Sequence, residues 1–218
     1  SKREGASSLQ ALRAEDGLEP MAIVSVLARL GTSDPIEPLH SLEPLIESFD
    51  FAKFSRATPK FDPDELLRVN AKLIHDMPYE EVRERLITMG LGHINAALWA
   101  VIRANISRLP EAEDWARIVS PDLAPVIDDP DFTSQAADLL PPEPWDAQTW
   151  DQWITEIKQK TGRKGKNLFM PLRRALTGMD HGPELHALLP LIGREEAERR
   201  LRGQSASATP ERLHTASS

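Results

Sequence analysis

The residues that could do chemistry are concentrated in one basic segment, residues 158–174, which reads KQKTGRKGKNLFMPLRR. It holds seven Lys and Arg residues and no acidic residue, in a chain of net charge −8, so the rest of the chain carries about −15. A cluster of positive charge in an acidic protein is typical of a site for a polyanion such as a nucleic acid. Gly162 and Gly165 let this backbone approach a ligand closely. The alternative is a solvated lysine-rich loop that leads into a helix.

The other polar residues form no catalytic or metal-binding pattern. His181 and His186 lie five residues apart, which is not the i, i+4 spacing of two ligands on one helical face, and no cysteine could complete a zinc site. Gly162, Gly165 and Lys166 resemble a phosphate-binding loop only superficially, because no Ser or Thr follows the lysine. No two carboxylates have the apolar neighbours that would raise the pKa of an acid catalyst. We therefore expect no metal and no independent catalytic site.

Helical periodicity dominates the elements that must position the basic segment. Apolar residues recur at i, i+3 and i+4, with prolines at first turns and glycines at helix ends. No segment shows strand alternation flanked by turn residues. We predict an all-α protein built of helical bundle modules in tandem. The predicted helices include residues 20–30, 63–74, 79–89, 93–109, 111–119, 132–140, 146–160, 168–176, 183–192 and 195–201.

A specific pattern follows the basic loop, in residues 168–201, which read LFMPLRRALTGMDHGPELHALLPLIGREEAERRL. A block of the type LFxPLRxALTG is followed by G-P-x-L and then by a helix that opens at G-R-E. With the basic glycine loop, this order and spacing resemble the carboxy-terminal anticodon-binding end of bacterial glutamyl-tRNA synthetase, a class I aminoacyl-tRNA synthetase. The resemblance implies the helical anticodon-binding fold of that class.

Further blocks extend the resemblance to about residues 1–202. Ser1, Lys2 and Arg3 look like the end of the KMSKS-type signature, and residues 18–38 and 61–74 resemble the blocks that follow it in the family. The HIGH motif and the nucleotide-binding half of the family have no counterpart in this sequence. The resemblance thus implies the carboxy-terminal part of the enzyme. Lys2 would be its ATP-contacting lysine, and we expect no activity from this part alone.

The resemblance also assigns site residues within the last module. Arg173 matches the family's arginine that contacts an anticodon base, and Gly182, Pro183 and Leu185 match the turn that packs around it. A guanidinium offers paired donors and a stacking plane, which suits an unpaired base. Some family members have a hydroxyl residue before the proline, whereas Gly182 can offer only backbone groups. The residues expected to bind tRNA phosphates are Arg163, Lys164, Lys166 and Arg174.

Three tryptophans near the basic loop, Trp145, Trp150 and Trp153, admit two interpretations. Aromatic rings beside positive charge can stack on unpaired bases. Trp150 and Trp153, however, lie three residues apart and share a helical face, and large aromatic side chains mostly serve burial. We therefore predict that these two anchor the core of the last module.

These expectations together describe the tRNA-binding region of a glutamate–tRNA ligase. Its partner would be tRNA(Glu), with tRNA(Gln) as a second candidate, and the intact enzyme would use ATP and Mg²⁺ to attach glutamate. No cofactor is expected in this part of the enzyme. A cytoplasmic monomer is expected, because no apolar run approaches the roughly 18–20 residues that cross a bilayer and the amino terminus lacks a signal-peptide core. The alternative is a helical protein-interaction or regulatory module without RNA binding.

Breaks in composition predict four segments. Residues 1–58 would hold the end of the KMSKS-type loop and a segment that contacts the tRNA stem. Residues 61–127 and 128–202 would be the first and second anticodon-binding helical modules, with the acidic stretch at 128–131 opening the second. Residues 203–218 are small and polar, with little apolar surface to bury, and are predicted to be a disordered tail.

Overall fold

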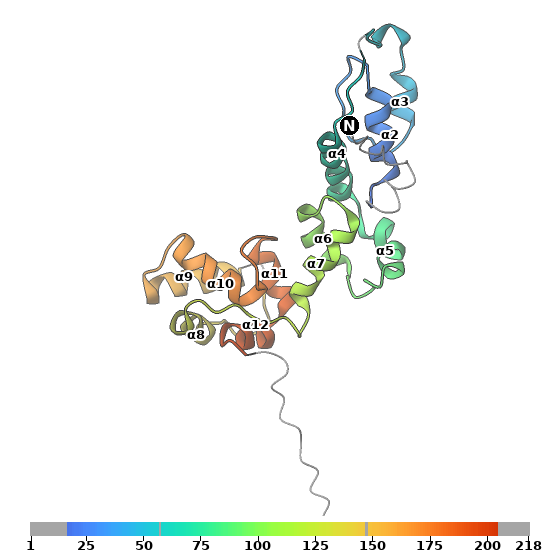
Figure 1. Ribbon diagram of the computed structural model, residues 1–218. Helices are drawn as coiled ribbons and strands as arrows, with labels where there is room; N and C mark the ends of the chain where they lie inside the picture. The colour runs from blue at the N-terminus through green and yellow to red at the C-terminus, as the bar shows by residue number, and fades with distance from the viewer. Residues whose placement is uncertain (1–16, 57, 147, 205–218) are drawn as a thin grey trace, which may run out of the picture. The chain divides into compact units, whose positions relative to one another are not determined.

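The computed structural model describes residues 17–56, 58–146 and 148–204, and this part of the chain is helical (Figure 1). Helices make up 61% of it, and the described residues form no strand beyond a single bridge between Thr32 and Phe54. The all-α prediction is confirmed. None of the described helices is both long and apolar enough to cross a membrane.

The α-helices are α2 (Pro20–Arg29), α3 (Glu43–Glu47), α4 (Pro63–Asp76), α5 (Tyr79–Thr88), α6 (Ala96–Ile102), α7 (Ala112–Ala116), α8 (Pro130–Asp138), α9 (Thr149–Thr161), α10 (Lys166–Thr177), α11 (Leu185–Ile192) and α12 (Arg194–Leu201). Short 3-10 helices are η1 (Phe51–Lys53), η2 (Arg103–Asn105), η3 (Leu109–Glu111) and η4 (Arg117–Val119).

The ends of these helices follow local sequence rules. Asp62 precedes Pro63, the first residue of α4, and its side chain accepts a hydrogen bond from the Asp64 N–H at 2.9 Å. Helices α9 and α10 end at Gly162 and Gly178, both with a φ of 69°. Glycine adopts this left-handed conformation at little cost. The basic loop, residues 162–165, runs from the end of α9 at Gly162 to Gly165, which directly precedes α10.

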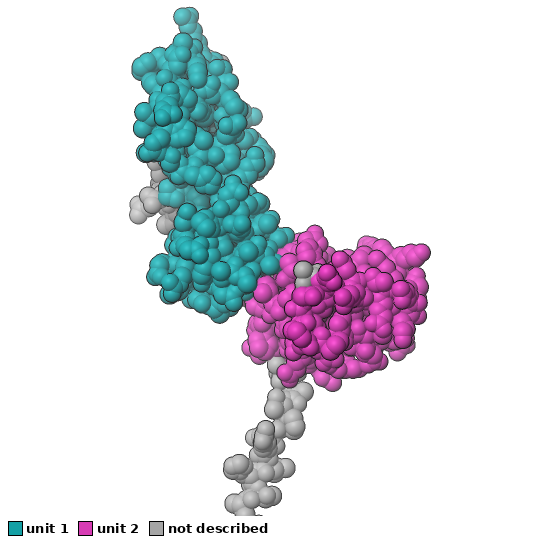
Figure 2. Space-filling model, turned by 180° about the vertical axis from the view of Figure 1, so that it is seen from behind, with its two compact units in different colours: residues 1–114 teal, residues 115–218 magenta. Residues whose placement is uncertain are grey.

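The chain divides into two compact units, residues 1–114 and 115–218, which Figure 2 shows in teal and magenta. The sequence predicts other boundaries, with modules at residues 1–58, 61–127 and 128–202. These modules stay a prediction. Lys2 lies outside the described residues, as does the expected tail from residue 205 onward.

Unit 1 is organised around the packing of α2 against α4. Asn70 of α4 is fully buried, where its side chain accepts a hydrogen bond from the Glu19 N–H and donates to the Ser107 carbonyl, both at 2.6 Å. The Glu19 carboxylate in turn accepts two bonds from Arg85, at 2.6 and 2.9 Å. Asn70 thus joins the start of α2 to the segment before η3. The apolar cluster around it contains Leu18, Ala22, Ile23, Val26, Leu66, Val69 and Leu73.

Unit 2 packs α8, α10 and α11 against α12 (Figure 1). At its centre Arg200 of α12 has no solvent exposure. Its guanidinium donates to the carbonyls of Ile118 and Leu176, both at 2.6 Å, and of Ser120 at 2.8 Å. Its Nε donates to Glu196 at 2.5 Å. Burial lowers the pKa of Arg200, and the carboxylate of Glu196 opposes that shift. One side chain therefore fixes α12 to α10 and to η4.

The predicted helix over residues 93–109 is wrong in its second half. Helix α6 ends at Ile102, a 3-10 turn follows, and Ile106 is extended, with φ −120° and ψ 145°. The Ile106 carbonyl accepts a hydrogen bond from His75 Nε2 at 3.0 Å, and the next carbonyl, of Ser107, accepts the bond from Asn70. Because a helix would use these carbonyls internally, the long-range bonds override the helical periodicity of the sequence.

Candidate nucleic-acid interface

Arg173 of α10 contacts the turn that precedes α11. Its Nη1 donates to the Pro183 carbonyl at 3.1 Å. The start of that turn is held by Thr177, whose hydroxyl donates to the Arg173 carbonyl at 2.7 Å and accepts from the Met179 N–H at 3.2 Å. Arg173 is half-buried, and among the described residues its guanidinium bonds only Pro183. Most of the five donors of the guanidinium are therefore free to bind a ligand.

The turn itself is built from residues that pack inward. Pro183 is buried and Leu185 is only 4% exposed, so both side chains pack into the interior of the protein and hold the turn in place. The structure brings together the four residues expected at an anticodon base, because Gly182 directly precedes the proline that Arg173 contacts and Leu185 follows it by two residues. Their contact with a base stays a prediction.

Gly182 has two reasons to be glycine. Its φ is 130°, a conformation that favours glycine, and a Cβ built there would overlap Cζ3 of Trp115 and lie 2.9 Å from its Cη2. The same ring meets His181 edge-on, with ring centroids 6.0 Å apart and an interplanar angle of 87°. Sequence reasoning missed Trp115, since nothing in the spacing of residues 115 and 182 indicates a contact.

Arg174, expected to bind a phosphate, is already engaged by two aspartates. Its Nε and Nη2 donate to Asp180 at 2.5 and 2.9 Å, and its Nη1 donates to Asp128 at 2.7 Å. These carboxylates raise the pKa of Arg174, whose bonds in turn lower the pKa of Asp180. Three of its five donors are thus engaged, so a phosphate would have to compete with two carboxylates for this guanidinium.

Arg163, the second arginine expected at a phosphate, is held in the same manner. Its Nη2 donates to Asp129 at 2.5 Å, and its guanidinium lies over the Phe132 ring, 4.0 Å from the centroid. Its Nη1 also approaches the carbonyl of Asn167 at 3.5 Å. Pro171 explains why that carbonyl is free, because proline has no N–H to complete the helical bond. Arg163 therefore ties the basic loop to the start of α8.

Lys164 and Lys166 differ from these arginines. Both are exposed, and the described part of the chain gives neither ammonium an ion-pair partner within 4.0 Å. Lys164 lies in the loop and Lys166 begins α10, on either side of Gly165, whose φ is 54°. A phosphate could bind these two lysines without breaking any ion pair.

The region that carries this surface has a match among known protein families. The family described as "Anticodon binding domain" matches residues 100–204, which include α10, the Gly182–Pro183 turn and α12. Residues 100–204 are therefore similar to an anticodon-binding domain. The matched range contains every residue for which the resemblance predicts a base or phosphate contact, from Arg163 to Leu185.

Relatives similar to the whole chain extend this result. The chain is 52% identical over 206 residues to a glutamate–tRNA ligase of Azospirillum brasilense, a match that covers 94% of this chain and 46% of that protein. It is 52% identical over 205 residues to glutamate–tRNA ligase 1 of Parvibaculum lavamentivorans, with 93% and 45% covered. The resemblance to glutamyl-tRNA synthetase is confirmed. The chain spans about half the length of the relatives it matches.

Solved structures share the fold. A glutamate tRNA ligase from Elizabethkingia meningosepticum, in complex with its amino acid, superposes with a TM-score of 0.72 at 18% identity, and the match covers 87% of this chain and 41% of that one. A glutamate–tRNA synthetase from Elizabethkingia anophelis gives 0.71 at 19% identity, with the same shares covered. At this identity the likeness concerns the fold alone. It agrees with the all-α architecture expected from the sequence.

The tryptophans beside the basic loop of the anticodon-binding domain serve mainly its packing. Trp153 has no solvent exposure, and its Nε1 donates to the Ala136 carbonyl at 2.9 Å. Trp150 is half-buried and packs edge-on against Trp153 and parallel to Phe169, with centroids 5.7 and 6.5 Å away. The predicted core position is confirmed for Trp153, whereas Trp150 is only half-buried.

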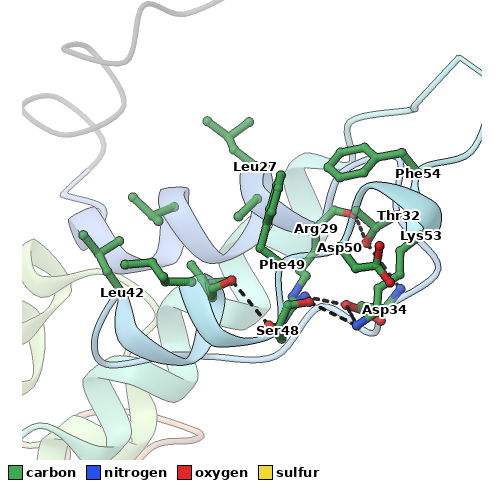
Figure 3. Close-up of a pocket in the computed structure, with 14 residues that line it drawn as sticks. Leu27, Arg29, Thr32, Asp34, Leu42, Ser48, Phe49, Asp50, Lys53 and Phe54 are labelled. Carbon is green, nitrogen blue, oxygen red and sulfur yellow. Dashed lines mark hydrogen bonds and ion pairs between the residues drawn. The ribbon is translucent and has the colours of Figure 1, made fainter.

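A hollow of about 560 Å³ in unit 1 lies outside the anticodon-binding domain and has a different character (Figure 3). Leu42, Ile46 and Phe49 line it with exposed apolar side chains. Its two cations, Arg29 and Lys53, both pair with Asp34, at 2.5 and 3.0 Å. This lining suits apolar groups rather than phosphates, so we do not assign it to nucleic acid.

We predict that the aspartate pairs make the anticodon-binding domain sensitive to acid. Bonds from Arg174 lower the pKa of Asp180, and electrostatic interactions with His181 and Lys166 lower it further. Bonds from Arg163 and from the Phe132 N–H lower the pKa of Asp129. A carboxyl with a lowered folded pKa stabilises the fold fully above its unfolded pKa of about 3.9 and loses that contribution as the pH falls through the folded pKa.

Urea midpoints of the wild type and Asp180→Asn, measured from pH 7 to pH 2, check this prediction. The wild type should be the more stable above about pH 5, and the difference should shrink toward zero below pH 4. Asp151→Asn, at an exposed position of α9, is the control and should show no such trend. A difference between wild type and Asp180→Asn that stays constant with pH would contradict the assignment.

Proposed function

We propose that this chain binds the anticodon arm of a tRNA, as part of a glutamate–tRNA ligase. One observation carries the proposal. Arg173 is held by the Pro183 carbonyl at 3.1 Å, while most of its donors bond none of the described residues, and it lies within residues that match an anticodon-binding domain. One N–H of this guanidinium is bonded and the other donors are available, so it can bond and stack on an unpaired base. Little side-chain freedom is lost on binding, because the bond to Pro183 already restricts the side chain.

In this proposal the basic residues divide into two groups. Arg173 reads an anticodon base, with backbone groups of Gly182 and the packed side chains of Pro183 and Leu185 shaping its surroundings. Lys164 and Lys166 bind phosphates, which is supported by their exposure and by the lack of any described carboxylate within 4.0 Å of their ammonium groups. Arg163 and Arg174 are weaker candidates for phosphate contact, because Asp129, Asp128 and Asp180 already hold them.

The remaining features of the proposal rest on the resemblance to glutamyl-tRNA synthetases. The partner is tRNA(Glu), or tRNA(Gln) as well, and the intact enzyme attaches glutamate with ATP and Mg²⁺. This region would help to orient the tRNA acceptor end for that reaction, in a monomeric cytoplasmic enzyme. The alternative of a protein-interaction module has no support among the similar proteins.

Salt dependence of tRNA binding tests the proposal. The affinity of the full chain should fall steeply with salt, because each phosphate contact releases counterions. Replacing Lys164 and Lys166 together by alanine should weaken binding to any tRNA and reduce the slope of log K against log salt by about 0.7–0.9 for each phosphate bond that the substitution removes. Lys72→Ala, at an exposed position of α4 in unit 1, is the matched control. Binding that is absent, or insensitive to salt, would favour the protein-interaction alternative.

A further inference from the structure

The Trp115 ring fills the volume that a side chain at position 182 would need. A Cβ on Gly182 would overlap Cζ3 of Trp115, with Cη2 at 2.9 Å and Cε3 at 3.2 Å. Separations under 3.0 Å essentially never occur at real Cβ atoms. The ring therefore lies directly on the backbone of Gly182, and a residue larger than glycine cannot share this space.

The same ring also restrains the residue before the glycine. His181 packs edge-to-face against Trp115, at a centroid distance of 6.0 Å. Edge-to-face packing is a favoured arrangement for aromatic rings. Two successive residues of the turn, His181 and Gly182, are thus fixed against one side chain of α7.

The residue that follows is the one that holds Arg173. The Pro183 carbonyl accepts the Nη1 bond at 3.1 Å, near the long end of the usual range for this bond. A shift of the turn by several tenths of an ångström would weaken the bond and release the guanidinium. Leu185, buried at 4% exposure, anchors the far side of the turn in the core. Trp115 is the restraint on the near side.

We propose that Trp115 is a positioning residue for base reading by Arg173, and that positions 115 and 182 form a coupled pair. A large ring at 115 requires glycine at 182, and a side chain at 182 requires a smaller residue at 115. This inference rests on the proposed function, because it names a residue that acts on the anticodon contact through the Gly182–Pro183 turn.

The coupling has a steric part and a backbone part. The φ of 130° at Gly182 strains any other residue regardless of the space available. Shrinking Trp115 therefore relieves the steric overlap but leaves the backbone strain. A side chain at 182 should be tolerated only in part when Trp115 is removed.

The test measures the affinity of the full chain for two tRNAs that differ only in the anticodon. Trp115→Ala should lower the affinity ratio between cognate and altered anticodon by about tenfold, within the range for removal of a base-reading bond, and leave the salt slope unchanged. Trp115→Phe keeps a ring on Gly182 and should retain most of the ratio. Trp145→Phe, in the same unit but bonded to Pro141 rather than to the turn, is the control and should change nothing.

A double-mutant cycle tests the coupling. Gly182→Ala should abolish discrimination in the wild type and cost clearly less in the Trp115→Ala background, because part of its cost is the overlap. If Trp115→Ala lowers the thermal midpoint of unit 2, Trp115→Leu replaces it as the background variant of the cycle. Additive effects, or an unchanged affinity ratio in the Trp115 variants, would overturn the inference. If the wild type itself binds no tRNA or does not discriminate anticodons, the proposed function fails as well.

Discussion

Replacing Arg200 by methionine should lower the free energy of unfolding of unit 2 by about 3–5 kcal/mol, the cost typical of breaking a buried charged pair. Arg200 is fully buried and donates to three carbonyls and to Glu196. Methionine fills much of the same volume but donates nothing. The carbonyls of Ile118 and Leu176 would then stay buried without a partner, and each such group costs about 1–3 kcal/mol.

Thermal unfolding followed by tryptophan fluorescence measures this effect, since four of the five tryptophans, all but Trp99, lie in unit 2. A destabilisation of that size should lower the thermal midpoint by about 12 °C or more for a domain of roughly 100 residues. Arg200→Lys keeps the charge but not the planar fork, so we expect an intermediate effect.

Arg202→Met is the matched control for Arg200. It lies two residues further along the chain, it is exposed, and its pairs with Asp138 and Glu198 are at the surface, at 2.8 and 3.0 Å. Such pairs contribute about 0–1 kcal/mol. Equal destabilisation by Arg200→Met and Arg202→Met would show that the buried bonds of Arg200 do not hold the unit together.

The last helices could be predicted from the sequence because local signals agree there. Gly162 and Gly178 mark helix ends, and the apolar spacing between them matches the buried face of α10. The segment after α6 could not be predicted. Its periodicity is helical, but His75 and Asn70 bond the carbonyls of Ile106 and Ser107 from more than thirty residues away.

The candidate site could likewise be predicted only in part. The resemblance named Arg173 and the Gly182–Pro183 turn, and the structure brings them into contact. It could not reveal that Arg174 pairs with Asp128, 46 residues earlier, because charge counts record composition and not pairing. Trp115 was missed for the same reason, since its contact with Gly182 depends on tertiary packing alone.

Replacing Arg173 by alanine is the second change with a large expected effect. It removes the side chain that we propose reads a base, at a cost of about 1–3 kcal/mol or about 5–150-fold in affinity for the cognate anticodon, as for a good bidentate base contact. Arg173→Lys keeps the charge but not the fork, and it should lose most of the discrimination. Arg83→Ala, an exposed arginine of α5 whose side chain is 59% exposed, is the control and should have little effect.

The most direct test of anticodon reading compares wild type and Arg173→Ala on two tRNAs that differ only in their anticodon bases, over a range of salt concentrations. We predict that Arg173→Ala binds the cognate tRNA about 5–150-fold more weakly and the altered one almost as well as the wild type does, with the same salt slope as the wild type. Equal weakening on both tRNAs, with a reduced salt slope, would make Arg173 another phosphate ligand. Anticodon reading by this helix would then be contradicted.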